Sequence, residues 1–215
     1  MKLRNWKSWQ FAASVLAPAA VSLLLVMAGV LGFVLWSTAN SDRLALERET
    51  ALVNKVLSEQ LERVPHDQES IAGRDATVIN TRLKFNQSWV EANLGQWMHD
   101  YFRHDRTFLL NAEDQPIYAM SAGATTIAEV YEQDREAYEP LVAQMRELIG
   151  NNGLKAFETG VTARIPHVSD FATISGYPAI VSVMPLLSDS GAIQQDAGTH
   201  LLHVSVRFLN DSFAK

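Results

Sequence analysis

The chain has 215 residues, 47% of them hydrophobic, and contains no cysteine, which excludes disulfides and thiolate metal sites. Its net charge is −6, but Lys2, Arg4 and Lys7 are the only charged residues before Asp42, so residues 42–215 carry −9. Because nucleic-acid binding needs clustered Lys and Arg to neutralise phosphates, this acidic region excludes nucleic acid as the main partner.

Residues 11–36 form an unbroken apolar segment that predicts a transmembrane helix. As a helix the segment would be about 39 Å long, which exceeds the thickness of the hydrocarbon layer of a bilayer. A cleaved signal peptide is the alternative, because residues 37–39 resemble a small-residue cleavage site. The apolar region of a signal peptide is only about 7–15 residues long, so we favour an uncleaved anchor.

The basic residues of the first ten positions set the orientation of this anchor. By the positive-inside rule, residues 1–10 are a cytoplasmic tail. Everything from Asp42 onward then lies in a periplasm or outside the cell, and the protein belongs to the inner (cell) membrane with one visible span.

A long membrane-proximal helix is predicted over Asp42–Val64. Its apolar residues recur at spacings of three and four and form one stripe: Leu46, Thr50, Val53, Leu57, Leu61 and Val64. Pro65 predicts the end of the helix, since the residue before proline avoids the α region. The stripe either packs on its own domain or pairs with a second copy, and we expect a homodimer through Asp42–Val64.

A further helix is predicted from Glu69 to Lys84, and an aromatic helix follows it. Trp89, Asn93, Trp97 and Tyr101 are four residues apart, so they stay nearly on one helical face. Asp100 lies seven residues after Asn93 and points the same way. Aromatic rings around an amide and a carboxylate suit a small-molecule pocket, although such rings also pack ordinary cores.

Strands are predicted in two blocks separated by a helical region that ends near Ile149. Period-two apolar runs and turn residues place the five strands at 107–110, 116–120, 171–175, 177–187 and 200–208. The prediction is therefore an α+β fold: an N-terminal transmembrane helix, a long helix, and a five-stranded antiparallel sheet with helices, on the plan of PAS and Cache domains.

The central segment also carries a family resemblance. Its residues are Trp89-x3-Asn93-Leu94-x2-Trp97-x2-Asp100-Tyr101, His104-Asp105-Arg106, Asn111-x2-Asp114 and Pro116-x-Tyr118-Ala119-Met120. This pattern resembles the class-four CHASE extracellular sensor domains, which precede diguanylate cyclase, phosphodiesterase or histidine kinase domains in bacterial membrane receptors. The resemblance spans residues 42–210.

The resemblance implies a sensory input domain for an unknown small-molecule ligand, with an output domain that controls cyclic di-GMP. It adds Tyr118 to the candidate ligand-binding set, which becomes Trp89, Asn93, Trp97, Asp100, Tyr101 and Tyr118. Because a receptor must return to the cytoplasm, residues 211–215 are expected to begin an exit segment of a longer protein.

No catalytic motif of the common hydrolase, metalloprotease or nucleotide-binding kinds is present, so we expect no enzyme activity in this chain and no cofactor. His99 and His104 would point about 140° apart on a continuous helix, so no metal site is expected either. The alternative to a sensor is a single-span envelope scaffold or partner-binding protein.

Overall fold

A computed structural model describes residues 4–151, 154, 164–195 and 198–209 of the chain. The chain divides into two compact units, Met1–Val56 and Leu57–Lys215. The exit segment expected at residues 211–215 lies outside the described residues.

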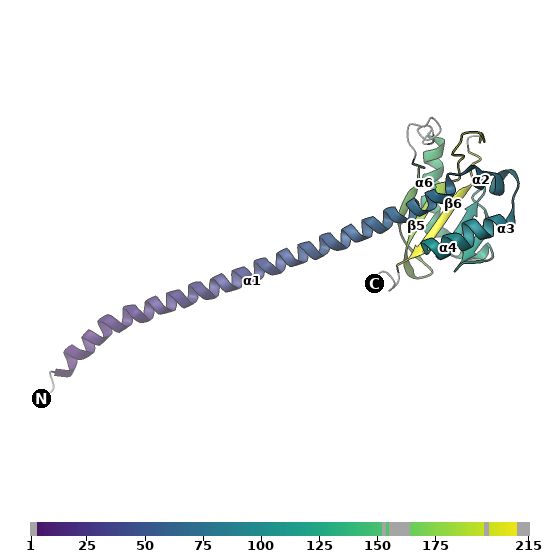
Figure 1. The fold of residues 1–215 in the computed structure, drawn as a ribbon. Coiled ribbons are helices and arrows are strands. Elements are labelled where there is room, and N and C mark those ends of the chain that lie inside the picture. The colour runs from purple at the N-terminus through teal and green to yellow at the C-terminus, as the bar shows by residue number, and fades with distance from the viewer. Residues whose placement is uncertain (1–3, 152–153, 155–163, 196–197, 210–215) are drawn as a thin grey trace. The chain divides into compact units, whose positions relative to one another are not determined.

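Helix α1 (Arg4–Ala72) includes both the predicted membrane span and the predicted membrane-proximal helix (Figure 1). Within it, Pro18–Ser37 is a 20-residue stretch of mean hydropathy 2.4 that is long and apolar enough to cross a membrane. Large apolar side chains in this stretch are exposed, as Leu24 is at 66% and Leu35 at 70%. A helix that is apolar all round suits lipid contact.

The helix end predicted at Pro65 is wrong, because α1 continues to Ala72. Proline supplies no N–H to the carbonyl of Leu61, four residues earlier. Beyond Pro65, however, Gln68 and Ile71 are almost fully buried, and the Gln68 side chain donates to the sheet backbone. These tertiary contacts outweigh one missing helical hydrogen bond, as packing generally outweighs local helix signals.

The predicted helix at 69–84 is divided. Its start belongs to α1, and the remainder forms α2 (Asp75–Val78) and the π-helical turn η1 (Ile79–Leu83). The division falls at Gly73, which forms a bridge with Leu187.

The predicted aromatic helix is present as three joined parts: α3 (Gln87–Val90), the π-helical η2 (Glu91–Gln96) and α4 (Trp97–Phe102). The Asn86 side chain caps its start by accepting from the Trp89 N–H at 3.2 Å. Arg103 ends it in the left-handed conformation, at φ 61°.

The sheet has six strands, each pairing antiparallel with its neighbours, in the order β3-β2-β1-β6-β5-β4. Their bounds are β1 (Arg106–Leu110), β2 (Pro116–Ser121), β3 (Ala124–Thr125), β4 (Val168–Ile174), β5 (Tyr177–Pro185) and β6 (Leu202–Phe208). The α+β class and the five predicted strands are confirmed. The sixth strand, β3, was not predicted, and it forms because Ala122 and Gly123 turn the chain back at positive φ.

Helices α5 (Glu129–Gln133) and α6 (Arg135–Gly150) follow β3. The sequence predicts an interruption near Pro140, but α6 is continuous there and the break lies earlier, at Asp134.

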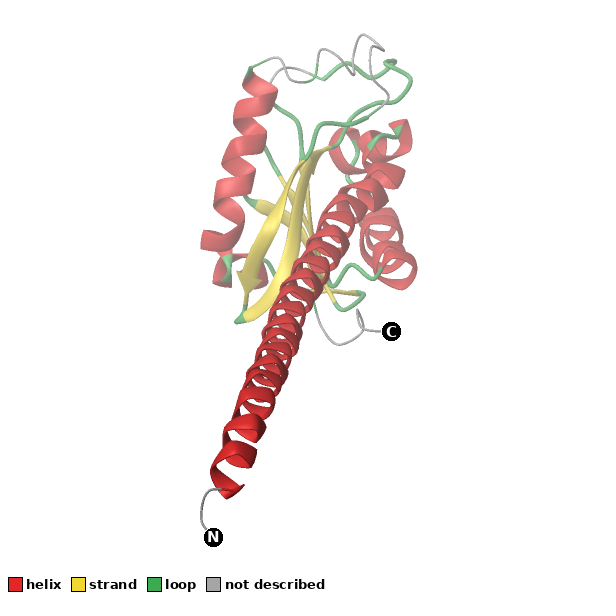
Figure 2. Cartoon of the chain, turned by 90° about the vertical axis from the view of Figure 1, so that its left-hand side faces the viewer, coloured by secondary structure: helices red, strands yellow, loops and turns green. Residues whose placement is uncertain are grey.

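Different helices cover the two faces of the sheet (Figure 2), and the side chains of the two faces also differ. On the α6 side, the Phe108 ring meets Tyr131 at 5.2 Å and Tyr138 at 5.4 Å. The strand register places valines on this same face: Val181, Val183, Val204 and Val206. The opposite face, under the last turns of α1, also has apolar residues such as Leu109 and Met184, but it adds buried polar side chains: Thr107, Ser182, His203 and Ser205.

Candidate functional site

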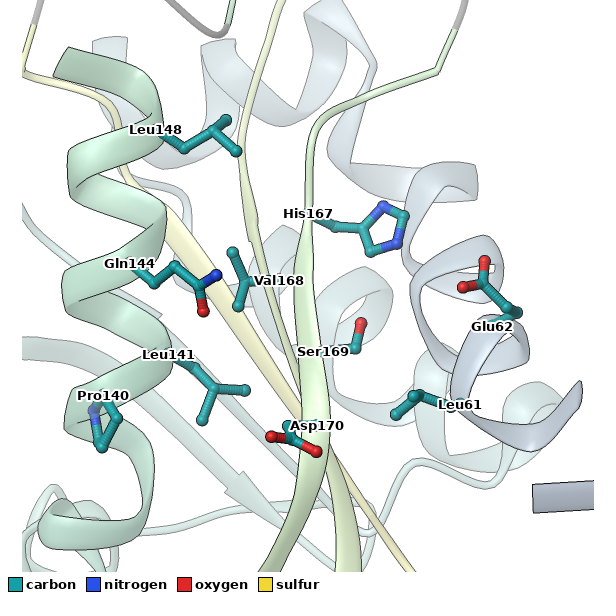
Figure 3. Close-up of a pocket in the computed structure, with 10 residues that line it drawn as sticks. All are labelled: Leu61, Glu62, Pro140, Leu141, Gln144, Leu148, His167, Val168, Ser169 and Asp170. Atoms are coloured by element: carbon teal, nitrogen blue, oxygen red, sulfur yellow. The ribbon is translucent and has the colours of Figure 1, made fainter. Parts of the chain in front are cut away.

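A groove of about 470 Å³ lies along β4, between the last turns of α1 and helix α6 (Figure 3). Its lining residues are Leu61, Glu62, Pro140, Leu141, Gln144, Leu148, His167, Val168, Ser169 and Asp170. Strand β4 stands at the end of the described strand order and is paired there with β5. The groove is therefore built along an edge strand, with one helix on either side.

The chemistry of the groove combines apolar side chains with acidic groups. Leu141 and Leu148 extend from α6 toward β4, and Glu62 lies on α1 on the other side of the strand (Figure 3). The charged residues of the lining are Glu62 and Asp170, both of them carboxylates. This combination suits a small molecule with an apolar body and a neutral or cationic polar group.

Sequence reasoning missed this groove. Its lining spans positions 61 to 170, and the acidic surface of the 125–149 helical region reads as an ordinary solvated face. No local sequence pattern predicts that Glu62 and Asp170 line the same groove, because this depends on where the helices pack on the sheet.

The predicted aromatic set is brought together in part. The buried face of the α3–α4 segment consists of Val90, Leu94 and Met98. The predicted row from Trp89 to Tyr101 therefore lies at the side of this face and not at its centre. Trp89, Asn93 and Trp97 are half-buried, whereas Asp100 and Tyr101 are exposed, the latter at 74%. The Trp97 ring lies 6.0 Å from that of Tyr101 and 5.0 Å, edge-on, from that of Phe102.

Two members of the set are engaged elsewhere. The Asn93 amide donates to the Trp89 carbonyl at 2.8 Å, within the same helix. Tyr118 is buried beneath Gly95, where an added Cβ would collide with its hydroxyl, and burial raises the pKa of Tyr118. Because Gly95 is two residues from both Asn93 and Trp97, Tyr118 meets the helix on a different face from theirs.

A buried polar cluster, here called the polar seam, lies between α1 and the sheet. Its members are Asp67, Gln68, His104, Thr107, Ser182, His203 and Ser205. The Gln68 amide donates to the His203 carbonyl at 3.0 Å, and His104 Nε2 lies 3.7 Å from Asp67 Oδ2. Through these contacts α1 is joined to β6 and to the loop before β1.

Burial sets the protonation of both histidines in the seam. It lowers the pKa of His104, although hydrogen bonding and charge from Asp67 act in the opposite direction. It also lowers the pKa of His203, to about 3. Both rings are therefore neutral at pH 7.

Ser205, His104 and Asp67 are in serial contact, since Ser205 Oγ hydrogen-bonds His104 Nδ1. A serine activated in this way can be a nucleophile, but only where a substrate reaches it. Ser205 and His104 are fully buried and Asp67 is 7% exposed. The arrangement as it stands is therefore sealed, and its evident effect is to position α1.

The comparisons with known proteins agree with the residues quoted above. No curated protein matches the chain. A family model, the CHASE4 domain, matches residues 56–215, which is most of the chain and includes the groove, the aromatic set and the polar seam. The chain therefore belongs to the CHASE4 family, the extracellular sensor domains of signalling receptors.

Proposed function

We propose that this chain is the extracytoplasmic input of an inner-membrane receptor, and that a small molecule bound in the groove changes how α1 packs on the sheet. The output domain of the receptor then makes or degrades cyclic di-GMP. One observation carries the proposal: Leu61 and Glu62 of α1 form part of the groove wall. A ligand there touches the helix that also contains the membrane-capable stretch Pro18–Ser37.

The signal is a population shift with no covalent chemistry. A ligand moves such an equilibrium only by binding one arrangement more tightly than the other. Because the groove has walls on α1, α6 and β4, a change in the position of α1 changes the contacts available to the ligand. Binding and α1 packing are thereby coupled.

A homodimer through Asp42–Val64 completes the proposal. In the part of this helix whose side chains are described, Leu52, Val53 and Val56 are 63%, 56% and 52% exposed. An exposed apolar stripe of this kind suits pairing with a second copy of the same helix.

The aromatic flank of α3–α4 is a second location for the ligand, with Trp89, Asn93, Trp97, Asp100, Tyr101 and Tyr118 as the proposed contacts. The π-helical η2 (Glu91–Gln96), which runs between Trp89 and Trp97, favours it. Such turns are frequent at functional sites because they depart from the regular helical ladder.

The test fills the groove in the full-length receptor. Gln144→Trp places a large ring in the lining, and Ala143→Trp places the same ring on the adjacent exposed position of α6, outside it. Cellular cyclic di-GMP is measured for both variants at matched expression. We expect Gln144→Trp to fix the output at one level and Ala143→Trp to behave as the parent. Equal outputs from all three proteins would favour the alternative, an envelope scaffold.

A further inference from the structure

The interface between α1 and the sheet is unlike the rest of the core. The α6 side is closed by aromatic rings and valines, as described above. The α1 side contains the polar seam, in which several buried polar atoms make no hydrogen bond to the described residues: Asp67 Oδ2, Gln68 Oε1, His104 Nε2, Thr107 Oγ1, and both ring nitrogens of His203. A buried polar interface of this kind can respond to a change of protonation, which an apolar interface cannot.

We propose that the polar seam is a proton-binding site: when His104 and His203 take up protons, α1 loosens from the sheet. The signalling role of this loosening depends on the function proposed above, but the loosening itself does not. The chemical ligand is the hydrogen ion, and the element it releases is the last part of α1.

The geometry around His104 supplies the first part of the argument. Its Nδ1 faces the Ser205 hydroxyl and its Nε2 faces Asp67, so a neutral ring can donate to one of them only. Charged groups act on it from three elements: Asp67 on α1, Arg207 on β6, and Asp105 in its own loop. The two carboxylates favour a proton on the ring, whereas Arg207 and the loss of water oppose it.

His203 has no comparable partner. It is fully buried, both its ring nitrogens lack a hydrogen bond within the described residues, and the titratable group acting on it is His104. A second positive charge beside a protonated His104 is repelled, so the two rings oppose each other's protonation in the docked arrangement.

The direction of the effect follows from linkage. Burial holds the pKa of each histidine below its ordinary value while α1 is docked. When α1 lifts and water enters, each ring returns toward about 6.5 and binds its proton more tightly. Protons therefore favour the lifted arrangement: docking is at full strength above about pH 6.5 and weakens as the pH falls below it.

Thiol labelling in the intact chain measures this, because the chain has no cysteine of its own. Val64→Cys places a reporter on the fully buried side of α1, and Val142→Cys places one under α6 on the other face of the sheet. Both labelling rates are divided by that of Ile127→Cys, which is 64% exposed and lies outside the proposed dimer helix, to remove the pH dependence of the thiol itself.

Between pH 7.5 and 5.5 we expect the normalised rate for Val64→Cys to rise by up to about tenfold for each histidine that gains water. The rate for Val142→Cys should stay flat. Replacing His104 and His203 together by Gln should abolish the rise, whereas His66→Gln, which changes an exposed histidine of α1, should leave it intact.

A flat profile for Val64→Cys in the parent chain would overturn the proposal. So would a parallel rise for Val142→Cys, which would mean general unfolding, or an unchanged rise in the double variant. None of these readouts needs the output domain. A negative labelling result would therefore leave the proposed receptor function standing, and a negative cyclic di-GMP result would leave the proton-binding site standing.

Discussion

Gly95→Ala should destabilise the chain although alanine is the better helix former. The added Cβ would collide with the Tyr118 hydroxyl while lying 3.5 Å from Tyr118 Cζ, which is ordinary contact. Alanine in place of glycine contributes about 0.5–1 kcal/mol in a helix. Overpacking a core costs about 1–3 kcal/mol, so the net change should be a loss.

The Tyr118→Phe background isolates the cause, because it removes the colliding oxygen and keeps the ring. There, Gly95→Ala should be neutral or stabilising, giving a coupling of about 1–3 kcal/mol between the two sites in a double-mutant cycle. The four proteins are compared by chemical denaturation of the full chain in detergent. Equal effects of Gly95→Ala in both backgrounds would refute the collision as the cause.

Three further substitutions test other parts of the domain. Arg146→Lys should cost about 1–3 kcal/mol, since the guanidinium donates to two carbonyls and one carboxylate that a single ammonium cannot serve together. Asp134→Asn should cost a similar amount at pH 7. Burial alone would raise the pKa of this carboxyl, but hydrogen bonds from Ser175 and the contact with Arg106 outweigh it and hold the pKa below its usual range. The contribution of the carboxylate is therefore present above about pH 3.8 and is lost as the pH falls below that value. If the ligand binds at the aromatic flank of α3–α4 and not in the groove, Trp97→Ala or Asp100→Asn should abolish the ligand response of the full-length receptor while the domain stays folded.

Each of these has its own control. Arg135→Lys changes a half-exposed arginine whose ion pair, with Glu132, is local in the sequence, and it should cost under about 1 kcal/mol. If the penalty of Asp134→Asn is the same at pH 3 as at pH 7, the carboxylate contributes nothing. A normal response from both the Trp97 and the Asp100 variants would leave the groove as the remaining ligand site.

Local patterns predicted the elements well and their ends poorly. The apolar run Thr107–Leu110 and the spacing of Leu202, Val204 and Val206 suffice to place strands, although both faces of these central strands prove to be buried. The helix end predicted at Pro65 was wrong because a proline inside a helix removes only one local hydrogen bond. The burial of Gln68 and Ile71 beyond it depends on the sheet and outweighs that loss.

The sites were harder to predict than the fold. The aromatic row was found because its spacing is helical, yet the face that enters the core is that of Val90, Leu94 and Met98. The groove and the polar seam are invisible to periodicity, since residues such as Asp67 and His104 meet only after the sheet has formed. Asp67 lies just beyond Pro65, where the sequence predicts the helix to end, so no local pattern indicates that it is buried.

The proline inside α1 also affects the groove. Because Pro65 has no N–H, the peptide carbonyl of Leu61 lacks its regular helical donor, and Leu61 belongs to the groove wall. A ligand that bonds to this carbonyl would use an acceptor that no change of a lining side chain removes. Single changes of the lining residues would miss such a bond, whereas Pro65→Ala, which restores the helical donor, would weaken it.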